Sequence, residues 1–210
     1  MATEVEIKLA FKEGLSDSRL DALESVLKDL GCHHRYAKKE LKNAYFDTPD
    51  FSLHQHKVAL RIRQSLNDQG KLNFIQTFKT AGKSVDGLSQ RGEWEWTLPE
   101  HKLDTEQLQQ CEAWPTGVTI EKLVTIFETN FVRYVFDVRW QDSLVELVLD
   151  WGEILSNNKH EKIHEIELEL KQGNQYDLKS LAQILTEKLP LYASDMSKAE
   201  RGVKLFQMSK

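Results

Sequence analysis

Charged and apolar residues alternate strictly in several segments of this chain of 210 residues. The stretch HEIELELKQG places Glu165, Glu167 and Glu169 at every second position, with aliphatic residues between them. Near the N-terminus, the stretch EVEIKLA repeats the pattern with Glu4 and Glu6. Because the side chains of a β-strand point alternately to its two faces, each stretch predicts a strand with one aliphatic and one charged face.

Other segments with the same alternation predict further strands. They cover residues 42–50, 58–65, 72–80, 90–98, 130–140 and 144–152. The turn sequence NDQGK predicts that 58–65 and 72–80 form a hairpin, and a second turn is expected at Gln141–Ser143. Polar residues and glycines at 81–89, and a polar run at 156–162, predict loops.

Four segments have the residue spacing of helices: 15–31, 104–111, 119–130 and 176–189. Ser16 or Ser18 is expected to cap the first helix and Gly31 to end it, whereas Pro190 ends the last. No internal repeat and no linker rich in proline and glycine divides the sequence. The pattern predicts a single α+β domain over residues 1–210, built mainly from antiparallel strands.

The charged faces of the predicted strands gather charges of one sign. Acids cluster at 4–6, 146–150 and 165–169, and bases cluster at 61–63. Any one of these strands, taken alone, is compatible with the solvated face of an antiparallel sheet. Solvated strand faces, however, more often carry uncharged polar residues and pairs of opposite charge than clusters of one sign. Six such strands together favour a closed barrel with the charged faces inside and the helices packed outside.

A charged lumen must pair its charges or bind ions. Clustered carboxylates, without thiolates or suitably spaced histidines, suit a hard divalent cation such as Mg²⁺ or Mn²⁺. Arginines and lysines in the same lumen suit phosphate oxygens. A lumen that holds both predicts a site for a metal-bound phosphate chain.

Composition excludes several other classes. The formal net charge of −5 argues against non-specific nucleic-acid binding. Cys32 and Cys111 form no CxxC pair, which suits a reducing compartment, and the N-terminus has no apolar signal core. We therefore expect a cytoplasmic protein without a nucleic-acid, membrane or obligate protein partner. P-loop, GxGxxG and GxSxG motifs are absent, which excludes those nucleotide-binding and hydrolase architectures. The pair His33–His34 is predicted to be a solvated feature after a helix end rather than a metal site.

Nine short charged motifs follow one another along almost the whole chain. They are EVEIK (4–8), YFDTPD (45–50), ALRIR (59–63), TFKTAG (77–82), LSQRGEWE (88–95), TNFVR (129–133), VELVLDWGE (145–153), EIELELKQG (165–173) and SKAERG (197–202). The first matches the ExExK signature, and the ordered set resembles the CYTH superfamily, the triphosphate tunnel metalloenzymes. Within that superfamily the chain is most similar to the bacterial inorganic triphosphatases.

The resemblance implies an eight-stranded antiparallel closed β-barrel, or tunnel, with a charged lumen. The matching metal-binding acids are Glu4, Glu6, Asp150, Glu165 and Glu167, and Glu169 continues their face. The matching phosphate-binding bases are Lys8, Arg61, Arg63, Lys79, Arg91, Arg133 and Lys198. The residues implied in catalysis are Glu4, Glu6, Lys8, Glu165 and Glu167. Glu93 and Glu146 fall on inward faces, where they are expected to orient bases, and Arg201 reads as a residue that caps the domain.

The implied reaction is metal-dependent hydrolysis of inorganic triphosphate to diphosphate and phosphate. Water attacks the terminal phosphorus in line, with the acids holding one or two cations and the bases stabilising the leaving diphosphate. The same motifs serve thiamine triphosphatases, nucleoside or RNA 5′-triphosphatases and class IV adenylate cyclases. A non-catalytic polyphosphate or nucleotide binder and a structural β-domain are the remaining alternatives, although the full set of acids favours an enzyme. The sequence shows no second, histidine-rich helical domain of the kind called CHAD, which often follows this domain in the bacterial enzymes.

Overall fold

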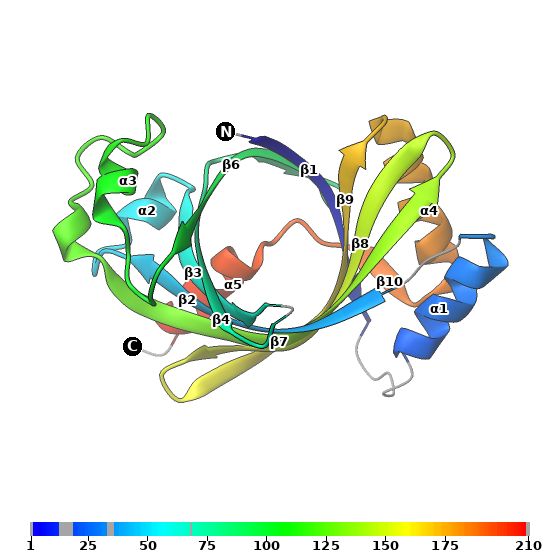
Figure 1. Ribbon diagram of the computed structural model, residues 1–210, viewed down its shortest axis with the longest axis horizontal. Coiled ribbons are helices and arrows are strands. Elements are labelled where there is room, and N and C mark those ends of the chain that lie inside the picture. Colours follow the sequence, from blue (N-terminus) through cyan, green and yellow to red (C-terminus); the bar gives the residue numbers. More distant parts are fainter. Residues whose placement is uncertain (1, 13–18, 33–35, 68, 209–210) are drawn as a thin grey trace.

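The computed structural model describes residues 2–12, 19–32, 36–67 and 69–208. In this part of the chain, eight antiparallel strands close into a barrel (Figure 1). In order around the barrel they are β1 (Ala2–Phe11), β9 (Lys159–Gln172), β8 (Ser143–Ser156), β7 (Val124–Trp140), β2 (Tyr36–Asp47), β3 (Ala59–Leu66), β4 (Leu72–Lys79) and β6 (Leu88–Leu98). Pairing of β6 with β1 completes the circle. The predicted tunnel fold is confirmed.

Short elements decorate the outside of the barrel. The strand β5 (Lys83–Val85) pairs with β6, and β10 (Leu191–Ala193) pairs with β1. The helices α1 (Arg19–Asp29) and α4 (Gln175–Lys188) lie on one side, whereas α2 (Ser52–Gln55) and α3 (Thr105–Gln109) lie on the other (Figure 1). A 3₁₀ turn, η1 (Ile120–Lys122), precedes β7.

The apolar faces of the strands pack against these outer helices. Leu147 and Leu168 share a core with Leu27 of α1 and Leu181 of α4, and all four are fully buried. A second core joins Leu60, Phe78 and the tryptophans of β6 to α2 and α3. The charged faces are therefore left for the interior, which inverts the usual arrangement of polar and apolar residues in a globular protein.

A helix at the C-terminal end of the described chain, α5 (Lys198–Gln207), lies across one end of the barrel (Figure 1). Its Val203 packs with Phe131, Ile154 and Ile163, which share strand faces with the charged residues of the lumen. Gly202 makes this approach close: a Cβ atom there would lie 2.2 Å from the ring of Phe127. The sequence analysis did not predict α5, although its Ser197–Glu200 capping box is a readable helix start.

Several local predictions are confirmed. The hairpin of β3 and β4, the turn at Gln141 between β7 and β8, and the helices α3 and α4 all form where they are expected. Gly31 follows α1 with φ 70°, a conformation that ends helices. The expected caps Ser16 and Ser18, and the pair His33–His34, lie outside the described residues.

The predicted helix at 119–130 is wrong. Only η1 is helical, and residues 124–130 belong to β7, where they pair with β2 and β8. The β-branched and aromatic side chains of this segment fit the pleated surface of a barrel strand, and pairing on both sides outweighs the helical spacing. The expected strand at 42–50 also begins earlier, at Tyr36, and ends at Asp47.

The two predicted loops are wrong in part. Residues 83–85 form β5, and most of 156–162 belongs to β8 and β9, which are joined at Asn157–Asn158. Asn157 has φ 51°, and a two-residue turn of this kind lets a polar run continue directly from one strand to the next. No helix of the described chain is long and apolar enough to cross a membrane.

Candidate functional site in the tunnel

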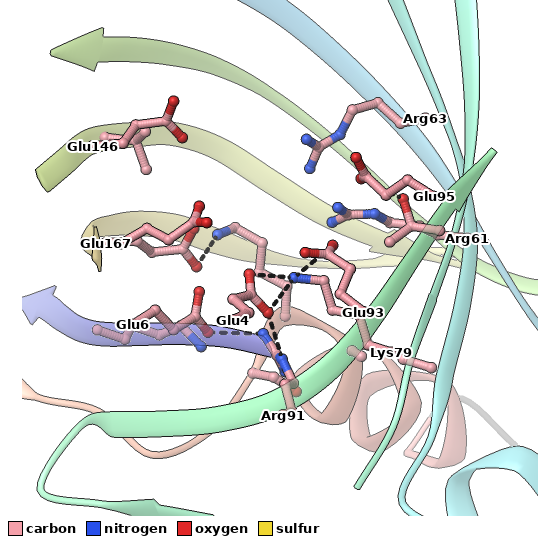
Figure 2. Close-up of a pocket in the computed structure, with 18 of the residues that line it drawn as sticks. Glu4, Glu6, Arg61, Arg63, Lys79, Arg91, Glu93, Glu95, Glu146 and Glu167 are labelled. Atoms are coloured by element: carbon pink, nitrogen blue, oxygen red, sulfur yellow. Dashed lines mark hydrogen bonds and ion pairs between the residues drawn. The ribbon is translucent and has the colours of Figure 1, made fainter. Parts of the chain in front are cut away.

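A cavity of about 300 Å³ lies inside the barrel, and charged side chains form most of its wall (Figure 2). The acids of the wall are Glu4, Glu6, Glu93, Glu95, Glu146, Glu167 and Glu169. The bases are Lys8, Arg61, Arg63, Lys79, Arg91, Arg133, Lys171 and Lys198. All seven predicted phosphate-binding bases thus line one cavity. Asp150 and Glu165, which were predicted to bind metal, lie behind the wall rather than on it.

Strand register brings the charges together. Glu4 of β1 lies opposite Arg91 of β6, whereas Lys8 lies opposite Glu167 of β9. Such cross-strand pairs of opposite sign stabilise neighbouring strands. The alternating pattern of the sequence therefore positions the site directly, because each inward residue has an inward neighbour on the next strand.

Glu4 and Glu6 are held by bases from the nearby strands β6 and β4. Lys79 Nζ donates to both carboxylate oxygens of Glu4, at 2.7 and 2.8 Å. Arg91 bridges the two acids, with Nε 2.9 Å from Glu4 and Nη2 2.7 Å from Glu6. Burial favours the neutral form of Glu4, but Lys79 and Arg91 outweigh it and lower its pKa to about 2.

Glu6 has less compensation from positive charge. Burial, followed by repulsion from Glu167, raises the pKa of the Glu6 carboxyl even though Arg91 opposes this. Burial also raises the pKa of Glu169, against the hydrogen bond from Lys171. Each of these two carboxylates therefore faces the cavity with one hydrogen-bonded base, Arg91 or Lys171, which does not offset the effect of burial.

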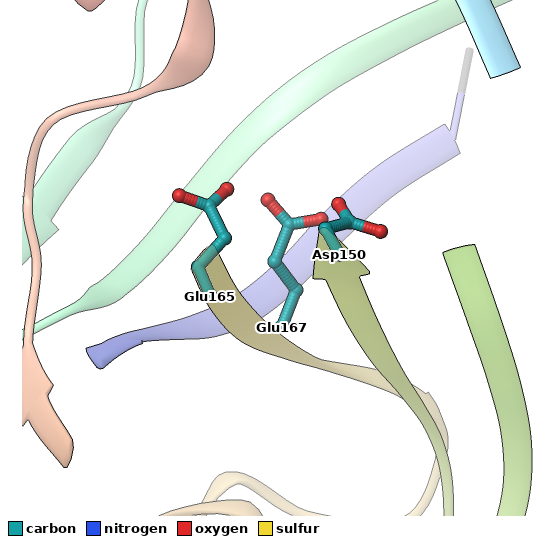
Figure 3. A group of neighbouring side chains, drawn as sticks. All are labelled: Asp150, Glu165 and Glu167. Carbon is teal, nitrogen blue, oxygen red and sulfur yellow. The ribbon is translucent and has the colours of Figure 1, made fainter. Parts of the chain in front are cut away.

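The three carboxylates Asp150, Glu165 and Glu167 form a tight group on β8 and β9 (Figure 3). Arg133 grips Asp150 at two points, Nε to Oδ1 and Nη2 to Oδ2, both at 2.7 Å. Burial raises the pKa of Asp150, but Arg133 and Lys198 reverse this and lower it. Asp150 is thus ionised, and each of the three carboxylates contacts a base of the protein.

Arg61 and Arg63 differ from the other arginines of the wall, Arg91 and Arg133, because neither forms an ion pair with a carboxylate in the described chain. The Nη1 atom of Arg61 lies 3.5 Å from the hydroxyl of Tyr45, and its buried Nε has no hydrogen-bond partner there. Arg63 Nε donates to Oδ1 of Asn43 at 2.9 Å. Burial, with repulsion from Arg61 and Arg133, lowers the pKa of Arg63 to about 9. Both guanidinium groups remain charged at neutral pH and repel each other.

Tyr45 and Asn43, the partners of these two arginines, were not predicted as site residues from the sequence. Tyr45 stacks on Phe127 with ring centroids 4.4 Å apart. Burial raises the pKa of its hydroxyl, but the charge of Arg61 more than offsets this and lowers it. The spacing of two residues within the strand 42–50 placed both side chains on one face, and that spacing was the available signal. Arg201, expected to cap the domain, instead joins α5 to Glu161 and Glu165 of β9, at 2.6 and 3.0 Å.

Comparison with known proteins identifies the family. The family model of the CYTH domain matches residues 2–203, and the chain belongs to this family. It is 34% identical over 206 residues to an inorganic triphosphatase of Haemophilus influenzae, covering 96% of this chain and 54% of that protein. The chain thus spans about half the length of that curated relative.

Solved structures share the fold. A putative adenylyl cyclase from Hippeastrum, described as having a dominant triphosphatase activity, is 22% identical with a TM-score of 0.62. The match covers 99% of this chain and 96% of that one. A Pyrococcus horikoshii protein is 18% identical with a TM-score of 0.59, and the match covers 96% and 98% of the two chains.

Proposed function

We propose that the cavity binds a triphosphate chain and that the protein hydrolyses inorganic triphosphate to diphosphate and phosphate with a divalent cation. The observation that carries this is the pair Arg61 and Arg63, two half-buried guanidinium groups without a carboxylate partner in the described chain. Buried charges of one sign are stable only with a counter-charge, and planar guanidinium groups match phosphate oxygens in geometry. The inorganic triphosphatase among the relatives supports the same chemistry.

Other bases of the cavity wall provide further contacts for a phosphate chain bound at Arg61 and Arg63. Lys79 and Arg91 reach the cavity from β4 and β6, opposite Arg133 and Lys198. In the described structure each of these four also contacts a carboxylate. A bound phosphate chain competes for their donors, so part of the binding free energy compensates for the loss of these internal contacts.

The carboxylate oxygens of the wall are suitable ligands for a hard cation. Seven acids and eight bases line the cavity in the described chain, so the wall is nearly neutral before a polyanion enters. A triphosphate brings several negative charges, and a divalent cation restores the balance. The residues that would hold it are the acids whose carboxylates reach the cavity, Glu4 and Glu6 foremost; Mg²⁺ and Mn²⁺ suit such oxygen ligands. When bound, the cation neutralises phosphate charge and makes the terminal phosphorus more susceptible to attack.

The protein's own residues supply orientation and proton transfer. Figure 2 shows Arg61 and Arg63 across the cavity from Glu6 and Glu167. Because the two arginines hold one end of the chain, its terminal phosphate faces the acids on β1 and β9. A carboxylate of the cavity accepts the proton of the attacking water. Glu169 is the better acceptor, because its raised pKa increases its basicity toward the value of an efficient general base.

An organic triphosphate is the second candidate substrate. A smaller cavity of about 140 Å³ adjoins the first and shares Lys8, Tyr45 and Arg91 with it. Apolar side chains, including Val58 and Leu60, contribute to its wall. This space admits a substituent on the phosphate chain, as in a nucleoside or thiamine triphosphate.

Comparison of substrates separates the two candidates. We expect kcat/KM with Mg²⁺ or Mn²⁺ to be highest for inorganic triphosphate, with ATP and thiamine triphosphate clearly slower. A higher value for either organic substrate would favour the second candidate. Formation of cyclic AMP from ATP would assign the protein to the cyclase branch of the family instead. The cytoplasmic location and the lack of nucleic-acid and obligate protein partners stay predictions.

A further inference from the structure

A compact group of charged side chains lies partly in and partly behind the cavity wall, where α5 meets β7, β8 and β9. Three carboxylates form its centre, with ligand oxygens within 4.8 Å of one another (Figure 3). Three bases surround them. The members are Asp150, Glu165 and Glu167 with Arg133, Lys198 and Arg201. One cation placed between the carboxylates contacts all three.

The ammonium group of Lys198 already takes that place. Its Nζ contacts Glu165, and it lies 2.8 Å from Oδ2 of Asp150 and 3.0 Å from Oε1 of Glu167. Lys198 is the first residue of α5, whose start is fixed by the capping box of Ser197. A divalent cation reaches the same oxygens only by expelling a buried ammonium group that is anchored in a helix.

The charges of the group balance without a metal ion. Three acids face three bases, and the fourth acid in contact, Glu161, lies on the solvent side of Arg201. Asp150 and Glu165 have exposed fractions of 0% and 1%, so water does not screen them. Adding a divalent cation to a balanced and buried group leaves uncompensated positive charge, which is costly in a medium of low dielectric constant.

Asp150 also sets the direction of Arg133. The two-point contact uses Nε and Nη2 of the guanidinium, while Nη2 donates to Glu167 as well, at 2.8 Å. The remaining nitrogen, Nη1, has no partner among the described residues. Because a guanidinium group is planar, hydrogen bonds along one edge fix the direction in which the opposite edge points. Arg133 lines the cavity, so Asp150 fixes how its guanidinium group is presented there.

We propose that Asp150 and Glu165 are positioning residues that hold Arg133 and Lys198 against the cavity, and that the three-carboxylate group is a socket for Lys198 rather than a divalent-metal site. This departs from the expectation that Asp150 and Glu165 bind metal. It rests on the proposed function only in that Arg133 and Lys198 are taken there as phosphate ligands. The metal is left to the acids that reach the cavity, Glu4 and Glu6 foremost.

The ammonium group of Lys198 gives a direct spectroscopic test on the wild-type protein. Buried ammonium groups held by hydrogen bonds exchange slowly with water and give resolved ¹H–¹⁵N signals, and Lys198→Arg assigns the signal by its loss. We expect the signal without metal and expect it to persist at saturating Mg²⁺. It should disappear in Asp150→Asn and remain in the matched variant Glu6→Gln. Loss of the wild-type signal on addition of Mg²⁺ would show that the cation enters the socket and would overturn the proposal.

Measurements of ligand binding distinguish a positioning role of Asp150 from a metal-binding role. Asp150→Glu keeps the charge but changes the reach of the carboxylate. We therefore expect its Kd for triphosphate, measured with chelator present, to rise at least about tenfold, as for the loss of a charge-assisted contact. Its affinity for Mn²⁺ alone should change less than about threefold, since no ligand of the metal is altered. Glu6→Gln should instead weaken Mn²⁺ binding at least about tenfold.

The opposite pattern for Asp150→Glu, with Mn²⁺ binding weakened and triphosphate binding unchanged, contradicts the proposal. If Asp150→Glu does not fold, the Lys198 signal of the wild-type protein decides alone. Neither measurement requires turnover, so a protein that lacks triphosphatase activity still gives a clear answer on the socket.

Discussion

Arg61 and Arg63 project into the same cavity from β3, and neither forms an ion pair with a carboxylate in the described part of the chain. The other arginines of the wall, Arg91 and Arg133, are compensated by carboxylates of the protein, as is Lys79. This asymmetry means that the barrel without ligand contains electrostatic repulsion at one wall (Figure 2). A bound polyanion removes that repulsion, and the stability of the protein should depend on it.

Triphosphate should stabilise the fold more than smaller anions do. A ligand that binds only the native state, present at about 100 times its Kd, stabilises it by about 2.7 kcal/mol and raises the melting temperature by several degrees. At equal ionic strength, diphosphate and phosphate should give smaller shifts, because only the longer chain reaches all of the bases. Differential scanning calorimetry measures each shift. Equal shifts with sulfate and triphosphate would indicate a plain β-domain with solvated charges.

Arg61→Ala should weaken the shift caused by triphosphate without destabilising the protein alone. The substitution removes one of two repelling charges and a buried Nε that has no partner among the described residues. A melting temperature without ligand that equals or exceeds that of the wild type is expected, together with a smaller ligand-induced rise. The exposed Lys204 of α5 provides the matched control, since Lys204→Ala removes a positive charge away from the cavity wall. A large loss of stability in Arg61→Ala would mean that Arg61 is compensated in the native state.

Activity should require a divalent cation. Turnover is expected to vanish with a chelator and to return with Mg²⁺ or Mn²⁺, because the carboxylates of the cavity are hard ligands. Ca²⁺ should support turnover poorly, since its larger and more flexible coordination shell misplaces the attacking water. Phosphate release in the three metal conditions measures this. Full turnover in excess chelator would exclude a cation from the mechanism.

The packing of α5 should matter for both stability and substrate binding. In Gly202→Ala, the new Cβ would lie 2.2 to 2.4 Å from three ring atoms of Phe127, which is buried and stacks on Tyr45. Overpacking of this kind costs about 1 to 3 kcal/mol and exceeds the gain in helix propensity of about 1 kcal/mol. Displacement of Phe127 moves Tyr45, the neighbour of Arg61, so KM for triphosphate should also rise. Lys204→Ala on the same helix should change neither quantity.

The barrel could be predicted from the sequence because its two faces differ in chemistry at every second residue. The alternation at Glu165, Glu167 and Glu169 fixed the strand and its orientation together, and the clustering of like charges indicated that this face turns inward. The same alternation placed Arg61 and Arg63 on an inward face, whereas the resemblance to the CYTH family supplied the other phosphate-binding bases, which line the same cavity. Local helical spacing failed at 119–130, because pairing with β2 and β8 is a property of distant segments.

The arrangement of contacts within the lumen could not be predicted in this way. Alternation shows that Asp150 and Glu165 face inward, but it does not show that Lys198 and Arg133 lie between them and the cavity. That layering depends on α5, which the sequence analysis did not predict. The roles of Tyr45 and Asn43 likewise follow from the neighbouring strand that carries Arg61 and Arg63.

The most direct test of the central claim is ³¹P NMR of inorganic triphosphate incubated with the protein and Mg²⁺. Equal amounts of phosphate and diphosphate should appear as triphosphate disappears. Glu6→Gln and Arg61→Ala, each shown by circular dichroism to be folded, should reduce the rate by at least roughly 100-fold, the effect of removing one group that stabilises the transition state. If the wild-type protein leaves triphosphate intact, or if both variants hydrolyse it at the wild-type rate, the tunnel is not the site of triphosphate hydrolysis.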